Sequence, residues 1–323
     1  TQYAFSAKLG GIFYLKDLEG DTNESLSNST LTASLSHSFD QTLRYNGNFS
    51  FAWQPEPNYS NGIANSRRDG DYIYVYVSSS LSKAWTTRWS TTVGASYSMI
   101  DYQEDSAKTD NRQYVNLNFN NRYKWTERLA LSINWNGSYC DREYGNDEFS
   151  NFVLAGAEYA VAQNTSATLR VGPQFKHVDN YGTKTYPSAE FGLNHRMSDR
   201  FSLGMFVRYS NEATNTYIPQ TGASYYSNET WRVGLNSTMK VTHRVSLNAG
   251  VNLISSDYSR ASSSSTDTNT LTFNATAGVK MMLTNALALT AQYSYTNGSY
   301  SGYNFPMPSY NRNVFSFGIN YIF

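Results

Sequence analysis

The sequence has 323 residues, of which 40% are apolar, 15% aromatic and only 15% charged, with equal numbers of acidic and basic side chains. About a quarter of the residues in an ordinary soluble domain are charged, and the many aromatic residues argue against disorder.

Zero net charge gives no reason to expect nucleic-acid binding, and a lone cysteine, Cys140, excludes an internal disulfide and a cysteine-based metal cluster. No run approaches the ~20 apolar residues of a membrane helix. No signal segment opens the chain at Thr1, so export would require its prior removal.

Alternation of apolar and polar residues runs along nearly the whole chain, whereas helical periodicity is almost absent. It is clearest at residues 245–253, where Val245, Leu247 and Val251 alternate with Ser246 and Asn248. Such strands have one apolar and one polar face. The predicted strands are residues 4–16, 28–38, 43–53, 71–83, 86–101, 112–124, 128–140, 151–162, 166–178, 185–196, 200–210, 228–241, 244–256, 268–281, 286–297 and 312–323.

Two kinds of connection alternate between these strands. Tight polar turns read FDQT, AWTT, WTER, AQNT, MSDR, VTHR and LTNA. The long polar loops are residues 17–28, 54–70, 101–111, 141–150, 179–184, 211–227, 257–267 and 298–311. No linker or change in composition interrupts this repeat, so residues 1–323 are predicted to form a single domain.

The strand lengths favour a barrel that spans a membrane. A tilted membrane strand needs about 9–11 residues within the bilayer, and a sheet in hydrocarbon must close on itself to satisfy its backbone. We therefore predict an all-β transmembrane antiparallel barrel of about 16 strands, within a range of about 14–18, with short periplasmic turns, longer extracellular loops and periplasmic termini. The alternative, a soluble β-sandwich or β-helix, gives no reason for polar faces on so many long strands.

Aromatic residues near the predicted strand ends suit the girdles of such a barrel. They are Trp53, Trp85, Trp89, Tyr123, Trp125, Tyr209, Tyr258, Tyr293 and Tyr321.

The C-terminal segment FSFGINYIF places Phe315, Phe317, Ile319, Tyr321 and Phe323 in strict alternation. It resembles the closing strand of Gram-negative outer-membrane proteins, whose last residue is typically Phe. The resemblance implies that these five residues are an insertion signal read by the barrel-insertion machinery. The segments RFSLGMFVRYSN and RVSLNAGVNLISSDYS also resemble β-barrel porins associated with exopolysaccharide export.

If the apolar face meets lipid, the opposite face lines a basic lumen. Its predicted cations are Lys8, Arg44, Arg88, Arg122, Arg170, Lys176, Arg196, Arg208, Arg232, Lys240 and Lys280. Only Glu158 and Glu190 oppose them, and most other carboxylates, Glu148 among them, are expected in or beside the long loops. A basic lining favours anions. The alternative is that these cations pair with lumen Glu, Tyr and Asn side chains and merely keep the wall hydrated.

The sequence thus predicts an outer-membrane channel of a Gram-negative, diderm bacterium that passes hydrophilic and preferentially anionic solutes by diffusion. The alternatives are the outer-membrane conduit of a polysaccharide-export system and a structural or docking barrel in a larger envelope complex. The expected partners are the lipid bilayer, lipopolysaccharide and the insertion machinery, with a periplasmic or surface protein or a homo-oligomer as further alternatives. We expect no cofactor, metal, nucleic acid or catalysis, because the four histidines have no Ser and Asp at a spacing that suits a triad.

Overall fold

Long β-strands make up almost all of the described chain. The computed structural model describes residues 1–14, 24–25, 28–54, 71–105, 108, 111–213, 217–218, 223–259, 268–301 and 309–322. Within these residues sixteen strands have 10 to 15 residues each: β1 (Gln2–Tyr14), β3 (Ser29–Ser38), β4 (Leu43–Gln54), β5 (Tyr72–Ala84), β6 (Trp89–Tyr102), β7 (Arg112–Lys124), β8 (Leu129–Arg142), β9 (Glu148–Ala162), β10 (Thr165–Val178), β11 (Gly182–Arg196), β12 (Phe201–Asn211), β15 (Ser227–Lys240), β16 (Val245–Ser259), β17 (Thr268–Met282), β18 (Leu287–Ser301) and β19 (Tyr310–Ile322). The strands β2 (Glu24–Ser25), β13 (Tyr217–Ile218) and β14 (Ala223–Ser224) have two residues each. No helix among the described residues is long and apolar enough to cross a membrane.

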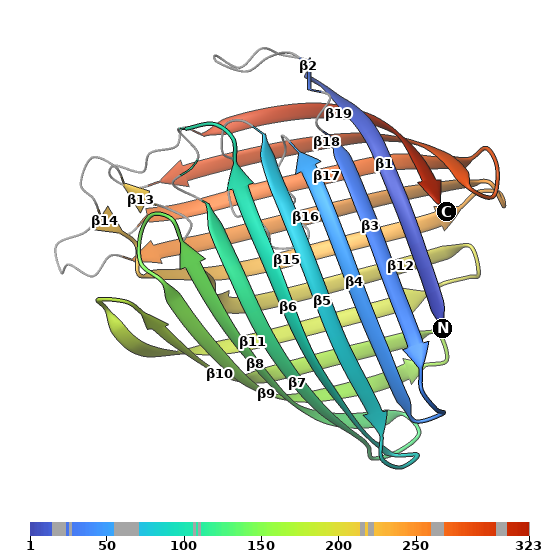
Figure 1. The fold of residues 1–323 in the computed structure, drawn as a ribbon, viewed down its shortest axis with the longest axis horizontal. Helices are drawn as coiled ribbons and strands as arrows, with labels where there is room; N and C mark the ends of the chain where they lie inside the picture. The colour runs from blue at the N-terminus through green and yellow to red at the C-terminus, as the bar shows by residue number, and fades with distance from the viewer. Residues whose placement is uncertain are drawn as a thin grey trace.

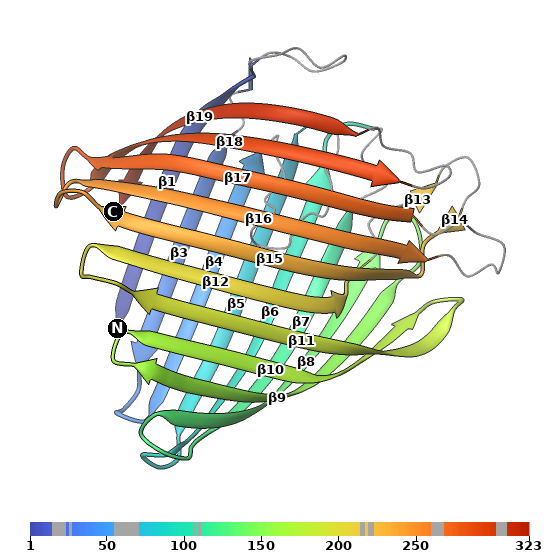
Figure 2. The ribbon, with the colours of Figure 1, turned by 180° about the vertical axis from the view of Figure 1, so that it is seen from behind.

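The long strands pair antiparallel with their neighbours, and the last pairs with the first. β1 and β19 are joined over nine residue pairs, from Ser6↔Ile322 to Tyr14↔Val314. The sheet therefore closes into a barrel (Figures 1 and 2), which removes the open edges that a flat sheet would leave. The predicted barrel of about 16 strands is confirmed, and the predicted strand bounds agree with those observed to within four residues.

Six of the tight turns share one local design. Five residues separate the last pair of facing residues, as between Lys124 and Ala130, and the second of these five is Asp, Thr or Ser. Its side-chain oxygen accepts a hydrogen bond of 2.7–3.0 Å from the backbone N–H three residues later, which holds the turn closed. The capping residues are Asp40, Thr86, Thr126, Ser198, Thr242 and Thr284. We call this end of the barrel the turn end, and both chain termini lie there; the opposite end is the loop end.

One connection at the loop end is shorter than predicted. Residues 179–184 were expected to form a long loop, but β10 and β11 run on until Val178 faces Gly182. Asn180 and Gly182 have φ angles of 69° and 80°, and Asn and Gly are the residues that accept this left-handed conformation most readily.

Candidate functional site

The two faces of the barrel wall differ in chemistry. In every long strand the even-numbered residues face one another across the strand pairs, as in Lys8↔Asn320, Arg208↔Arg232 and Lys280↔Thr290. All large apolar side chains that are exposed within the described long strands have odd numbers. We therefore call the even-numbered face of these strands the inner face and the other the outer face.

Ten of the eleven cations predicted for the lumen lie on the inner face. The exception is Arg88, which lies in the turn between β5 and β6. The prediction also missed five inner-face cations: Arg112, Lys124, Arg142, Lys184 and Arg312. Each stands near a strand end, but the same alternation assigns it to the inner face.

Carboxylates neutralise several of these cations. Glu158 pairs with Arg122 at 2.8 Å and Glu190 with Arg170 at 3.3 Å. Glu148, expected at a loop, is instead the first residue of β9, and its side chain is only 3% exposed. Its carboxylate oxygens form ion pairs with Arg142 Nη2 at 2.7 Å and with Lys176 Nζ at 3.1 Å. These partners offset the cost of burying the charge.

A second missed carboxylate, Glu212, lies just beyond the end of β12. Arg232 donates to both of its oxygens at 2.6 Å, and Arg208 donates to Oε1 at 2.7 Å. The Lys176 ammonium donates to the Glu212 carbonyl at 2.8 Å and to Asn211 Oδ1 at 2.9 Å. These bonds hold residues 211–213 against the interior of the barrel. We call residues 211–213 the pinned segment.

Pro187 explains why β12 separates from β11 at this point, while its pairing with β15 continues to Asn211↔Glu229. The pairing of β11 with β12 ends at Ala189↔Tyr209. In the same register Asn211 would next face Pro187, which has no N–H to donate. The side-chain amide of Gln174 takes this place: its Nε2 donates to the Asn211 carbonyl at 2.6 Å, and its Oε1 accepts from the Asn211 N–H at 2.9 Å.

The electrostatic setting of Glu212 keeps it ionised. Burial alone would raise the pKa of this carboxyl, but the guanidinium groups of Arg232 and Arg208 outweigh burial and lower the pKa from 4.5 to about 2. The pinned segment is therefore held by a charged carboxylate at neutral pH.

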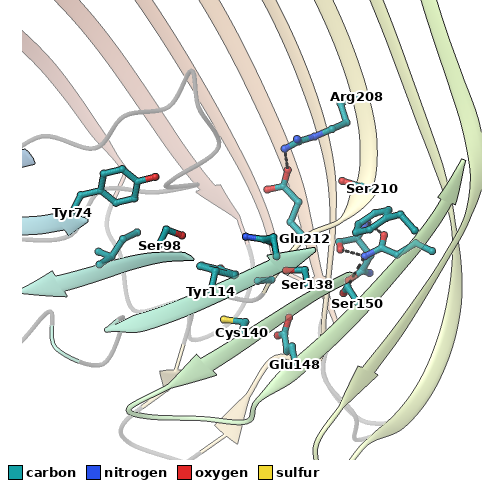
Figure 3. Close-up of a pocket in the computed structure, with 16 residues that line it drawn as sticks. Tyr74, Ser98, Tyr114, Ser138, Cys140, Glu148, Ser150, Arg208, Ser210 and Glu212 are labelled. Carbon is teal, nitrogen blue, oxygen red and sulfur yellow. Dashed lines mark hydrogen bonds and ion pairs between the residues drawn. The ribbon is translucent and has the colours of Figure 1, made fainter. Parts of the chain in front are cut away.

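A cavity of about 330 Å³ lies between the pinned segment and the inner faces of β5 to β10 and β12. Figure 3 shows Glu212 bonded to Arg208 on one side of it, with Tyr74, Tyr114, Cys140 and Glu148 on the strands around it. Hydroxyl and amide groups of Ser98, Asn116, Ser138, Ser150 and Gln174 complete most of its lining. The lining combines these polar groups with apolar side chains such as Ile100 and Phe152, and its carboxylates are neutralised by adjacent cations.

Charge is unevenly distributed around the lumen. Within the described long strands the inner-face carboxylates lie on β9 and β11, and Glu212 follows β12. We call β9–β12 the ion-paired sector. The inner faces of β15–β19 and of β1 and β3–β8 carry Lys and Arg but no carboxylate among the described residues. We call these strands the carboxylate-free sector.

The outer face holds most of the aromatic residues predicted for the girdles. Trp53, Trp89, Tyr123, Tyr209, Tyr293 and Tyr321 lie on it, and Trp85 and Trp125 flank it in the turns. Tyr258 was assigned wrongly. It is even-numbered, only 1% exposed, and packs against Tyr225 with their ring centroids 5.4 Å apart.

The alternating C-terminal residues also lie on the outer face. Phe317 and Ile319 are 51% and 54% exposed, and Phe315 and Tyr321 share their face. Phe323 lies outside the described residues. The role of these residues in insertion stays a prediction.

The histidines do not contribute to the inner face. His37, His177 and His195 lie on the outer face, and His243 lies in a tight turn. Within the described part of the chain no three His, Cys, Asp or Glu side chains are placed to hold a metal ion.

Comparison with known proteins agrees with this architecture. Residues 167–323 match the family model described as outer membrane protein beta-barrel domain. No curated protein matches the sequence. The outer membrane channel DcaP of Acinetobacter baumannii is similar in structure, with 14% identity, a TM-score of 0.52 and coverage of 99% of this chain and 96% of that chain.

Two further solved structures match with lower scores. A triple mutant of the Rhodopseudomonas blastica porin has 12% identity and a TM-score of 0.43 over 100% of this chain and 99% of that chain. A bacterial polysaccharide outer membrane secretin has 8% identity and a TM-score of 0.45, with coverage of 99% and 98%.

The closed antiparallel barrel, with its apolar exterior and polar interior, defines the chain as a porin-like outer-membrane β-barrel. The family match runs from β10 to the C-terminus and covers slightly less than half of the chain.

Proposed function

We propose that this protein is a passive channel for hydrophilic solutes in the outer membrane of a Gram-negative bacterium, and that it prefers anions. The observation that carries the proposal is the carboxylate-free sector, whose cations line one continuous part of the inner face. Cationic side chains along a pore lower the electrostatic cost of an anion and raise that of a cation. No covalent chemistry is required.

The ion-paired sector contributes differently to passage. Its carboxylates are engaged by arginine and lysine side chains at 2.6–3.3 Å, so that side of the lumen attracts ions of either sign less strongly. The pinned segment also occupies space on that side. Solutes therefore pass preferentially along the carboxylate-free sector, where Lys8, Lys240 and Lys280 form no ion pair with any residue that the structure describes.

Planar-bilayer recording of the purified barrel tests this function. Under a KCl gradient at neutral pH we expect the sign of the reversal potential to show that chloride is more permeant than potassium. Replacing Lys8, Lys240 and Lys280 together with Gln should move that potential toward zero. Lys83→Gln is the matched control, because Lys83 lies on the outer face beside Asp40, and it should change nothing.

Cation selectivity of the wild-type channel would refute the anion preference. Absence of conductance would refute the channel itself. A silent barrel that co-purifies in mild detergent with other chains would instead favour a conduit or docking barrel that works with partner proteins.

A further inference from the structure

Three lysine side chains converge on one row of the inner face near the turn end. Across five consecutive strands the facing residues are Lys240, Ser246, Lys280, Thr290 and Gly318. Lys8 enters the same row from β1, because its Cε lies 2.9 Å from the point where a Cβ on Gly318 would stand. We call Lys240, Lys280 and Lys8 the lysine row.

The spacing of these residues allows two ammonium groups to meet one ligand. Neighbouring strands lie about 4.8 Å apart, so the backbone positions of Lys240, Lys280 and Gly318 follow one another at intervals of about 10 Å. A lysine side chain is flexible and carries three donors. Adjacent members of the row can therefore bend toward a shared anion.

The lysine row has no internal counter-charge. None of its three members forms an ion pair or a side-chain hydrogen bond with any residue that the structure describes. The described inner faces of β15–β19 and β1 hold no Asp or Glu. By contrast, Arg122 and Arg170 in the same lumen are paired with carboxylates.

The positions between the lysines suit an oxyanion. Ser246 lies between Lys240 and Lys280, and Thr290 lies between Lys280 and the end of Lys8. The Thr290 hydroxyl already donates to the Gly318 carbonyl at 3.1 Å, so the hydroxyl that can donate to an oxyanion is that of Ser246. Because residue 318 is glycine, the Lys8 side chain can lie against the wall instead of being displaced from it.

We propose that the lysine row is a binding site for multiply charged oxyanions, with the phosphate group as its preferred ligand. The inference depends on the proposed channel function in one respect: the channel is what brings such solutes into the lumen. A phosphate carries close to two negative charges and several acceptor oxygens, so it can bridge two ammonium groups and a hydroxyl. Chloride has one charge and gains less from the same row.

Equilibrium binding to the purified barrel in phosphate-free detergent tests the site without requiring conduction. Isothermal titration should detect saturable binding of inorganic phosphate at moderate ionic strength. A parallel titration with glycerol phosphate asks whether a phosphate group carried by an organic solute is accepted as well. Binding of both identifies the phosphate group as the ligand, and binding of inorganic phosphate alone restricts the ligand to the free ion.

The variants assign the binding to these residues. We expect the triple Lys8→Gln, Lys240→Gln, Lys280→Gln protein to lose affinity by at least about tenfold, because charge-assisted hydrogen bonds are the strong ones. Gly318→Ala should cause a smaller loss, since its Cβ displaces Lys8. The outer-face control Lys83→Gln should bind phosphate like the wild type.

Absence of phosphate binding by the wild type would overturn the site even if the barrel conducts. An unchanged affinity in the triple variant would also overturn it, provided that its far-UV circular dichroism matches the wild type. Binding by a barrel that does not conduct would leave the site standing and refute only the proposed channel.

Discussion

Glu212 joins two neighbouring strands, because Arg208 belongs to β12 and Arg232 to β15. Removing one partner of a buried ion pair costs about 3–5 kcal/mol, since the remaining charge stays desolvated. The pinned segment keeps its other bonds to Gln174, Lys176, Ser227 and Asn228, so we expect it to loosen around residue 212 without separating completely from the wall.

Glu212→Gln should therefore raise the conductance of single channels at neutral pH. The matched control is Glu158→Gln, which breaks the pair with Arg122 but touches no residue of the pinned segment. Equal conductance in Glu212→Gln and the wild type would show that the pinned segment does not limit passage.

The pH dependence follows from the low pKa of Glu212. A carboxyl whose pKa is depressed in the folded protein stabilises it above the ordinary value of 4.5, and that stabilisation is lost as the pH falls toward about 2. We expect the wild-type conductance to stay level from pH 7 to about pH 5 and to rise below that. Glu212→Gln should lack this rise, and a rise of equal size in both proteins would exclude Glu212 as its origin.

The facing of individual residues could be predicted from the sequence wherever a strand was recognised. Lys8, Lys240 and Lys280 were assigned to the lumen because alternation fixes the face once the apolar side is known. Glu148 and Tyr258 were misassigned because they stand at strand ends, where a polar stretch reads equally well as a loop. Glu212 could not be found, since only the tertiary arrangement brings Arg232 to it.

At the scale of the strands, Pro187 and Gln174 together decide where β12 separates from β11. The proline removes a donor from β11, and the glutamine amide supplies the bonds that Asn211 would otherwise lack. The strand pattern alone predicted the end of β12 to within one residue, at 210 instead of Asn211. It could not predict the direction that the chain takes afterwards, because that direction depends on a side chain from β10.

Pro187→Thr restores the missing donor in a residue type that favours strands. We expect the pairing of β11 and β12 to extend to Asn211 and the pinned segment to move away from the lumen. Amide hydrogen exchange at Asn211 and single-channel conductance would both report the change. Pro173→Thr is the control. Pro173 lies on β10 and faces Pro187 of β11, but β10 is not the neighbour of β12, so a restored N–H at residue 173 cannot bond Asn211. No difference between the two variants would contradict the role given to Pro187.

At the scale of the whole molecule, the barrel depends on the seam between β1 and β19. Its nine pairs join the two ends of the described sheet, and without them both strands would present open edges. The closure was predicted from the physical need to satisfy backbone groups in a membrane, not from any local feature of these two strands.

Cysteine cross-linking can verify the seam and its register. Leu9→Cys with Ile319→Cys, in a Cys140→Ser background, should form a disulfide on oxidation, because Leu9 faces Ile319 and facing residues lie within disulfide range. Leu9→Cys with Phe315→Cys is displaced by four residues and should not react. Non-reducing denaturing electrophoresis distinguishes the closed ring from the linear chain, and cross-linking of the displaced pair alone would refute the register.

The repeated capped turn bears on the size of the pore. Each hairpin that ends in such a turn contains its own capping residue, an apolar outer face and a polar inner face. A hairpin of this design can be added or removed without changing its neighbours, so the circumference of the cylinder would vary by two strands at a time. Pore diameter in this architecture is then a matter of how many copies of one small unit the gene encodes, whereas selectivity is set separately by which side chains those units turn inward.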